Sequence, residues 1–152
     1  MPFDALLMLA DNTKDWTKAY LDLYGTAAAN ISTTKNAGGF DVIDLGSAKI
    51  GGSVRGLAVV LVIDEVGEAA GDQLTVTVQE SATEIFTTPH ELAEFDILAA
   101  TRGVILGSEC PCTVIRRISP TLQFLRVLAS TGAGADFHTC WVLLSPYPYR
   151  VL

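Results

Sequence analysis

The sequence predicts an all-β protein, built as an antiparallel sandwich or barrel, and three observations lead to this expectation. One stretch is continuously apolar and rich in Val and Ile, a second alternates apolar and polar residues, and turns containing Gly or Pro separate several short segments. The first pattern is typical of a strand buried on both faces and the second of a strand buried on one face. Short strands at close spacing indicate an antiparallel sandwich or barrel.

The core is expected to centre on residues 56–66, which contain seven consecutive apolar residues, four of them β-branched. Side chains alternate between the two faces of a strand. Leu57, Val59, Leu61 and Ile63 therefore share one face, and the other face is apolar as well. Such a strand either lies in the middle of a sheet covered on both sides, or has its second face covered by a partner chain.

The remaining elements follow from local patterns. Residues 73–80 alternate cleanly and predict a half-buried strand with one wet face. Residues 1–10 are expected to form a strand or an arm. Residues 11–25 predict one short N-terminal helix, because their apolar residues have the i, i+3, i+4, i+7 spacing of one helical face. Residues 26–39 are expected to form a loop. Residues 146–152 form an extended tail that is not expected to join a sheet interior, because Pro lacks the N–H donor. Further strands are expected at 40–46, 94–98, 103–107, 112–118, 121–130 and 137–145. Residues 81–91 are expected to form a loop between the strands at 73–80 and 94–98. Together with the core strands, the further strands make about eight, the number in a jelly roll.

Length and composition limit the function classes. The 152 residues suit a single domain, 1–152, with extended segments at 1–10 and 146–152. An apolar content of 49% excludes a disordered chain. Ten basic residues face seventeen acidic ones, so nucleic acid is not an expected partner. No apolar run is long enough to cross a bilayer, and the N-terminus does not resemble a signal peptide, so synthesis in the cytoplasm is expected.

One constellation could carry chemistry: Cys110, Cys112, His138 and Cys140 form two i, i+2 pairs of metal-ligating residue types. The residue types suit a tetrahedral zinc site, but the spacing differs from that of familiar zinc modules. Buried Cys residues in the core are the simpler interpretation. We therefore predict no catalytic, cofactor or metal site, and keep a ligand- or metal-binding, cupin-like barrel that uses these four residues as the alternative hypothesis.

Several segments resemble one family. Six segments are similar, in their order along the chain, to the jelly-roll cement (decoration) proteins of tailed bacteriophages. They are the opening FDALLML, FDVIDLG at 40–46, LAVVLVIDE at 57–65, QLTVTVQES at 73–81, LQFLRVLASTGAG at 122–134 and the closing HTCWVLL. The resemblance implies a structural protein without catalytic activity. It also implies binding to the outside of a capsid built from an HK97-type shell protein, so that the protein would be located on the outer surface of the virion.

The expected partners are therefore the HK97-type major capsid protein and further copies of this chain, as a dimer or trimer, with no membrane and no small-molecule substrate. Both ends of the chain are too apolar and aromatic for solvated arms. The predicted interface residues are Phe3, Leu6, Leu7, Tyr147, Tyr149 and Arg150. Aromatic residues and Arg are enriched at interface centres, and the two prolines of the tail lower the entropy lost on docking.

Overall fold

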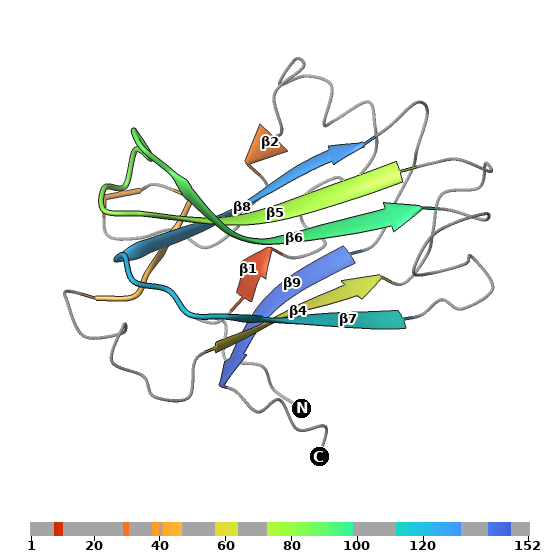
Figure 1. Cartoon of the computed structure of the whole chain (residues 1–152). Coiled ribbons are helices and arrows are strands. Elements are labelled where there is room, and N and C mark those ends of the chain that lie inside the picture. The colour runs from red at the N-terminus through yellow and green to blue at the C-terminus, as the bar shows by residue number, and fades with distance from the viewer. Residues whose placement is uncertain are drawn as a thin grey trace.

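Nine strands form two antiparallel sheets in the part of the chain that the structure describes (Figure 1). This computed structural model describes residues 8–10, 29–30, 38–39, 41–46, 57–63, 73–98, 112–131 and 140–146, with side chains at 38–39, 41–46, 57–63, 74–96, 113–130 and 140–145. The strands are β1 (Met8–Ala10), β2 (Ala29–Asn30), β3 (Ile43–Asp44), β4 (Leu57–Ile63), β5 (Gln73–Ser81), β6 (His90–Leu98), β7 (Cys112–Ile118), β8 (Phe124–Thr131) and β9 (Cys140–Pro146). These residues contain no helix, and the all-β prediction is confirmed for them.

The order of the strands is nested along the chain. One sheet has the order β1-β9-β4-β7, and the other has the order β2-β8-β5-β6, with β3 also paired to β8. Early strands thus pair with late ones: β1 with β9, β2 with β8, β4 with β7 and β5 with β6, each pair antiparallel. Strands from the first half of the chain therefore pair with strands from the second half. The pairing begins with the terminal strands β1 and β9 and ends with β5 and β6, which are consecutive in the chain.

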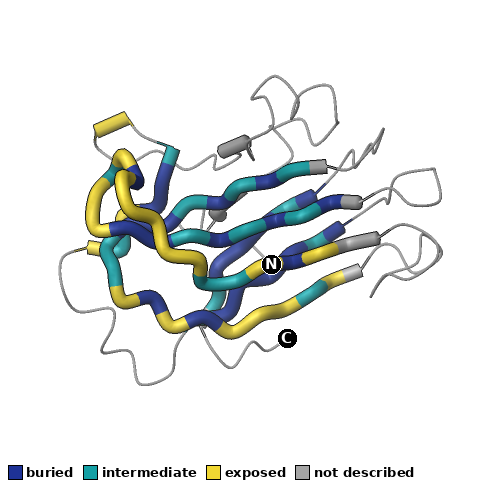
Figure 2. Tube along the Cα trace, turned by 45° about the horizontal axis from the view of Figure 1, so that its top comes forward, coloured by how far each residue is buried: buried dark blue, intermediate teal, exposed yellow. Residues whose placement is uncertain are grey.

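A single apolar core joins the two sheets. Val59, Leu61 and Ile63 of β4 belong to one buried cluster with Leu74 and Val76 of β5, on the opposite sheet. Such a shared core is consistent with the predicted sandwich. Figure 2 shows the alternation of buried and less buried residues along the strands that results from packing one face of each sheet inward.

The central strand is placed as the sequence predicts. β4 lies between β9 and β7, and its inward residues Val59, Leu61 and Ile63 are fully buried, while Leu57 at its start is half-buried. Ala58 and Val60, on its other face, are fully buried too. The strand is therefore covered on both faces within the chain itself, which is the first of the two arrangements expected from its composition. In β5 the prediction of one buried and one wetter face is also confirmed, because Leu74, Val76 and Val78 are buried while the residues between them are half-buried.

Several boundaries differ from the expectation. β6 begins at His90 rather than at residue 94. Val78 of β5 pairs with Ala93 and Gln79 with Glu91, so Leu92 of β6 forms a bulge that breaks the alternation by which the sequence would indicate a strand. β8 begins at Phe124 rather than at residue 121. β2 lies in the segment 26–39, which was predicted to be a loop. The expected helix at 11–25 and the strand at 103–107 lie outside the described residues.

The prediction for the tail is wrong at its first residue. Pro146 is the last residue of β9, opposite Leu57 of β4, in a strand that has a neighbour on each side. The missing N–H is tolerated there because the ladder ends at this position. The described residues contain no helix long and apolar enough to span a membrane.

Candidate functional site

The predicted interface residues Phe3, Leu6, Leu7, Tyr147, Tyr149 and Arg150 all lie outside the described residues. The described strands nevertheless fix where the two terminal segments begin. β1 pairs antiparallel with β9, so Met8 lies toward the Pro146 end of that strand. Pro146 and Ile118 are both opposite Leu57. The chain therefore enters β1 and leaves β9 at the end of the sheets from which residues 119–123 also lead away.

The cysteines that were considered as metal ligands are separated by a strand. Cys112 of β7 and Cys140 of β9 both pair with Ile63, which lies between them. Two strand spacings separate their Cα atoms by about 9–10 Å, beyond the roughly 7 Å that a disulfide spans. Cys140 is buried in the core cluster, as expected for a core residue. Cys110 and His138 lie outside the described residues, and the residues that the structure does describe contain no group of three or more potential metal ligands.

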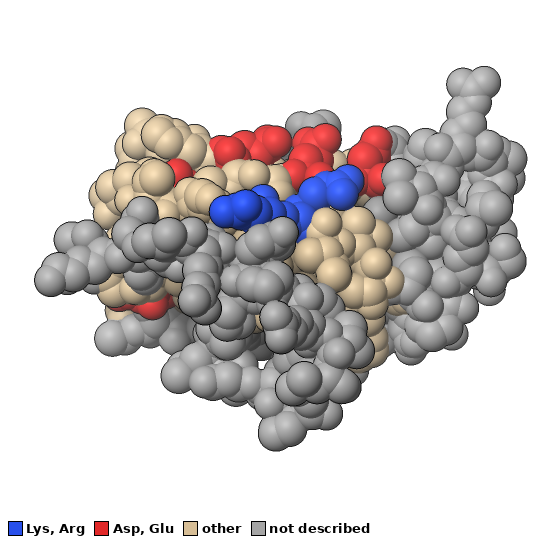
Figure 3. Space-filling model, turned by 60° about the horizontal axis from the view of Figure 1, so that its bottom comes forward, with Lys and Arg blue, Asp and Glu red and all other residues tan. Residues whose placement is uncertain are grey.

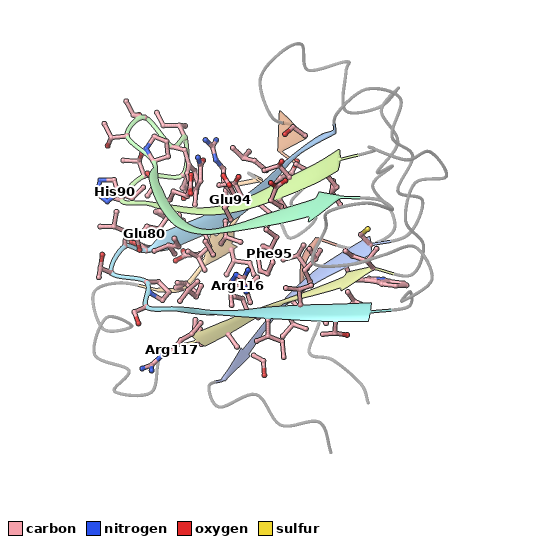
Figure 4. All side chains as sticks on the ribbon, turned by 45° about the vertical axis from the view of Figure 1, so that its right-hand side comes forward. Glu80, His90, Glu94, Phe95, Arg116 and Arg117 are labelled. Carbon is pink, nitrogen blue, oxygen red and sulfur yellow. The ribbon has the colours of Figure 1, made fainter. Side chains whose placement is uncertain are left out.

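Three connections gather at the same end of the sandwich: residues 41–46, 82–89 and 119–123 (Figure 1). We call them together the loop end. In Figure 4, Glu80 and His90 mark this end, where β5 finishes and β6 begins. Hydrogen bonds and a small apolar cluster join the three connections, and each contact involves one of the segments that carried the family resemblance.

The turn at 41–46 is fixed by a carboxylate and a glycine. Asp44 Oδ1 accepts a hydrogen bond of 2.7 Å from the Gly46 backbone N–H, and Gly46 has φ +83°, which favours glycine. The same Oδ1 accepts a 2.9 Å bond from Gln123 Nε2, and the Leu45 N–H donates to the Gln123 carbonyl at 2.8 Å. The last four residues of the FDVIDLG segment, 43–46, therefore form a tight turn that is tied to the β7–β8 connection.

Glu80, near the end of β5, binds the same β7–β8 connection through its side chain. Its side chain is only 4% exposed. Oε2 accepts hydrogen bonds from the backbone N–H groups of Thr121 (2.7 Å) and Leu122 (3.0 Å), and Oε1 accepts one from the Thr121 hydroxyl (3.0 Å). A buried carboxylate is tolerated when such donors replace its water shell. Residues 121–123 are therefore shaped by Glu80, which is why β8 starts only at Phe124.

Arg126 secures the 82–89 loop. Its Nε and Nη2 donate to Gln79 Oε1 at 3.0 and 2.8 Å, and its guanidinium lies 4.3 Å from the centroid of the Phe86 ring. Burial lowers the pKa of the Arg126 guanidinium, which nevertheless stays charged at neutral pH. Phe86 also packs with Val42 and Phe124. Arg126, which stands between Leu125 and Val127 in the segment 122–134, thus places a cation on the outer face of β8, against an aromatic ring of the loop.

The loop held in this way presents an apolar side chain to solvent. Phe86 has φ +52°, a conformation that costs a non-glycine residue about 1–2 kcal/mol, and the contacts of its ring stabilise it. Its neighbour Ile85 is 67% exposed and is the more exposed of the two large hydrophobic residues that lie at the surface among the described residues. Thr87, Thr88 and Pro89 beside it are exposed and uncharged. A rigid loop with an exposed Ile is suited to binding an apolar pocket of a partner.

The sequence contains one signal for this site that the prediction did not use. Glu80 continues the inward series Leu74, Val76, Val78, so period-two alternation places it on the buried face. A charged residue at such a position implies dedicated hydrogen-bond donors. No local pattern predicts the partners of Arg126 and Asp44, which are Gln79 and Gln123, because these lie 47 and 79 residues away in the chain.

In comparisons with known proteins, no protein-family model and no curated protein matches this chain.

Proposed function

We propose that the protein is a jelly-roll capsid decoration (cement) protein that binds the outside of an HK97-type shell through its loop end. The proposed role is structural: the protein clamps adjoining shell subunits, and many copies on one lattice make weak individual contacts effective through avidity.

The nested strand order supports the jelly-roll type. In a jelly roll the chain folds as a long antiparallel hairpin that is wrapped into two sheets. The pairs β1·β9, β2·β8, β4·β7 and β5·β6 follow this nesting, and their alternation between the two sheets agrees with such a wrapping. The short β3 beside β2 on β8 is an addition to the eight-stranded pattern.

The observation that carries the proposed role is the convergence at the loop end. The 82–89 loop with exposed Ile85 lies there, and the chain enters β1 and leaves β9 at the same end. The terminal segments, which the sequence marks as interface segments, thus begin at the same end of the sandwich as a loop with an exposed apolar side chain, although they begin in the other sheet. The proposal assigns contacts with adjoining shell subunits to all three.

Sedimentation of the purified protein with capsid shells tests the proposal. Empty shells are assembled from the HK97-type major capsid protein encoded in the same genome, and binding is measured as protein recovered with the shells at increasing concentration. We expect saturable binding at a fixed ratio to shell subunits and a higher temperature of shell disruption. A genome without such a shell protein, or shells that leave the protein in the supernatant, contradict the proposal.

Ile85→Ser is expected to weaken shell binding roughly tenfold or more without changing the melting temperature. Burial of an Ile side chain contributes about 1.5–3 kcal/mol, and the exposed side chain makes no comparable contribution within the free chain. The matched control is Ile85→Leu, which keeps the apolar volume and should bind within about threefold of the parent. If the Ser and Leu variants bind shells equally well, Ile85 is not at the contact.

Deletion of residues 147–152 is expected to abolish decoration while the truncated chain melts as the parent does. The described part of β9 ends at Pro146, so the deletion removes none of the described residues of that strand. Thermal unfolding and shell sedimentation are measured on the same preparation. A truncated chain that is destabilised in isolation, or that decorates shells normally, would show that the tail is not an interface segment.

A further inference from the structure

One long side of the sandwich carries opposite charges on its two strands. β6 and β7 each end one of the two sheets among the described strands, and they lie on the same side (Figure 1). The Arg116 guanidinium of β7 lies 5.8 Å from the centroid of the Phe95 ring of β6, which brings the two edges together. In Figure 4, Arg116 points toward β6, whereas Arg117 points away from it.

The charges are sorted by strand. Glu91, Glu94 and Asp96 are exposed along β6, whereas Arg116 and Arg117 are exposed on β7 beside Ile115, which is 39% exposed. Figure 3 shows basic side chains adjoining a row of acidic ones on one face of the molecule. We call these six residues the side surface. It contains two of the three basic side chains that the structure describes, although the whole chain has a net charge of −7.

We propose that the side surface binds the side surface of a second copy of this chain. Its charge pattern is complementary to itself under one of the two simple two-fold arrangements. An axis parallel to the strands places β6 of each copy opposite β7 of the other, so that carboxylates face arginines twice. An axis across the strands places β6 against β6, and like charges at contact distance are unfavourable. The sorting of charge by strand therefore selects the first arrangement.

The association is expected to be weak and dependent on concentration. β6 has nine residues and is thus about 30 Å long, and the two sheets are about 10 Å apart. A strip as long as β6 and as wide as the distance between the sheets has a smaller area than the roughly 800 Å² per partner of a standard interface. Ile115 lies on the same face of β7 as Arg117 and adds an exposed apolar side chain to the β7 part of the side surface. The inference does not rest on the capsid role, since the purified chain alone tests it.

Charge exchange gives a sharp test by sedimentation velocity. One variant combines Arg116→Glu with Arg117→Glu, a second combines Glu91→Lys with Glu94→Lys, and a third carries all four changes. We expect the parent to dimerise, and each of the first two variants to self-associate at least tenfold more weakly. An equimolar mixture of these two should form heterodimers, and the fourfold variant should dimerise as the parent does, because its charges are exchanged between the strands rather than lost.

Controls keep each result interpretable. Thr87→Glu with Thr88→Glu adds negative charge at the loop end and should change association less than twofold. If Arg116→Glu lowers the melting temperature, Arg117→Glu and Glu94→Lys alone provide the same exchange. The proposal is overturned by a parent that stays monomeric up to about 1 mM, by association that the reversals leave unchanged, or by a mixture and a fourfold variant that remain monomeric.

Discussion

Replacing Leu61 with Ala is expected to lower the free energy of unfolding by roughly 2–5 kcal/mol. Leu61 is fully buried in β4, opposite Val114 of β7 and Val142 of β9. Its inward side chain packs in the cluster that joins the two sheets. Strands on both sides restrict relaxation, so the deleted carbon atoms leave a cavity. For a domain of this length the melting temperature should fall by roughly 5–15 °C, as measured by thermal unfolding and confirmed by denaturant titration.

Thr77→Ala is the matched control for the phase of the strands. Thr77 lies on the outer, half-buried face of β5, between the fully buried Val76 and Val78. We expect a loss below about 1 kcal/mol, because surface substitutions away from special contacts usually have small effects. Equal losses for the two variants would show that the assignment of inward and outward faces is wrong.

The parts of the fold that the sequence predicts are those where a local pattern and the tertiary environment agree. Residues 57–63 are apolar on both faces and become a central strand buried on both faces. β5 alternates, and its inward residues are the buried ones. β7 has the predicted bounds, Cys112–Ile118, because a proline stands just outside each end. In these strands no long-range contact has to override the local preference.

The remaining differences come from contacts that are distant in sequence. β2 has two residues and no strand pattern, and its pairing with β8 alone identifies it. The first four residues of β6 were missed because the bulge interrupts their alternation. The start of β8 is set by Glu80, about 40 residues earlier in the chain. A local pattern carries no information about such partners.

The candidate site was predicted to a smaller extent than the fold. Composition identified the terminal segments as interface candidates, but it did not identify the 82–89 loop at the same end of the sandwich. Ile85 lies in a stretch that reads as an ordinary turn, and only the contacts of Phe86 with Arg126, Val42 and Phe124 show that this loop is held rigidly. The sorting of charge between β6 and β7 likewise requires knowledge that these two strands are neighbours across the sandwich.

Replacing Glu80 with Ala is expected to lower the free energy of unfolding by roughly 2–4 kcal/mol, because it removes the acceptor for three donors at once. The side chain is buried, and both backbone N–H groups of Thr121 and Leu122 depend on it. Amide hydrogen exchange at these two residues should accelerate more than at the centre of β8. The effect should reach residues 41–46 as well, since Gln123 next to this pair carries the bonds to Leu45 and Asp44.

Glu80→Gln separates hydrogen bonding from charge at the same position. The amide oxygen can accept from the two backbone N–H groups, and the amide nitrogen can donate to the Thr121 hydroxyl, which then acts as acceptor. All three contacts are kept without charge assistance, so we expect a loss of only about 1 kcal/mol. If Gln destabilises the protein as much as Ala does, the charge of the carboxylate rather than its acceptors holds the connection. If neither variant is destabilised, the 119–123 connection does not depend on Glu80.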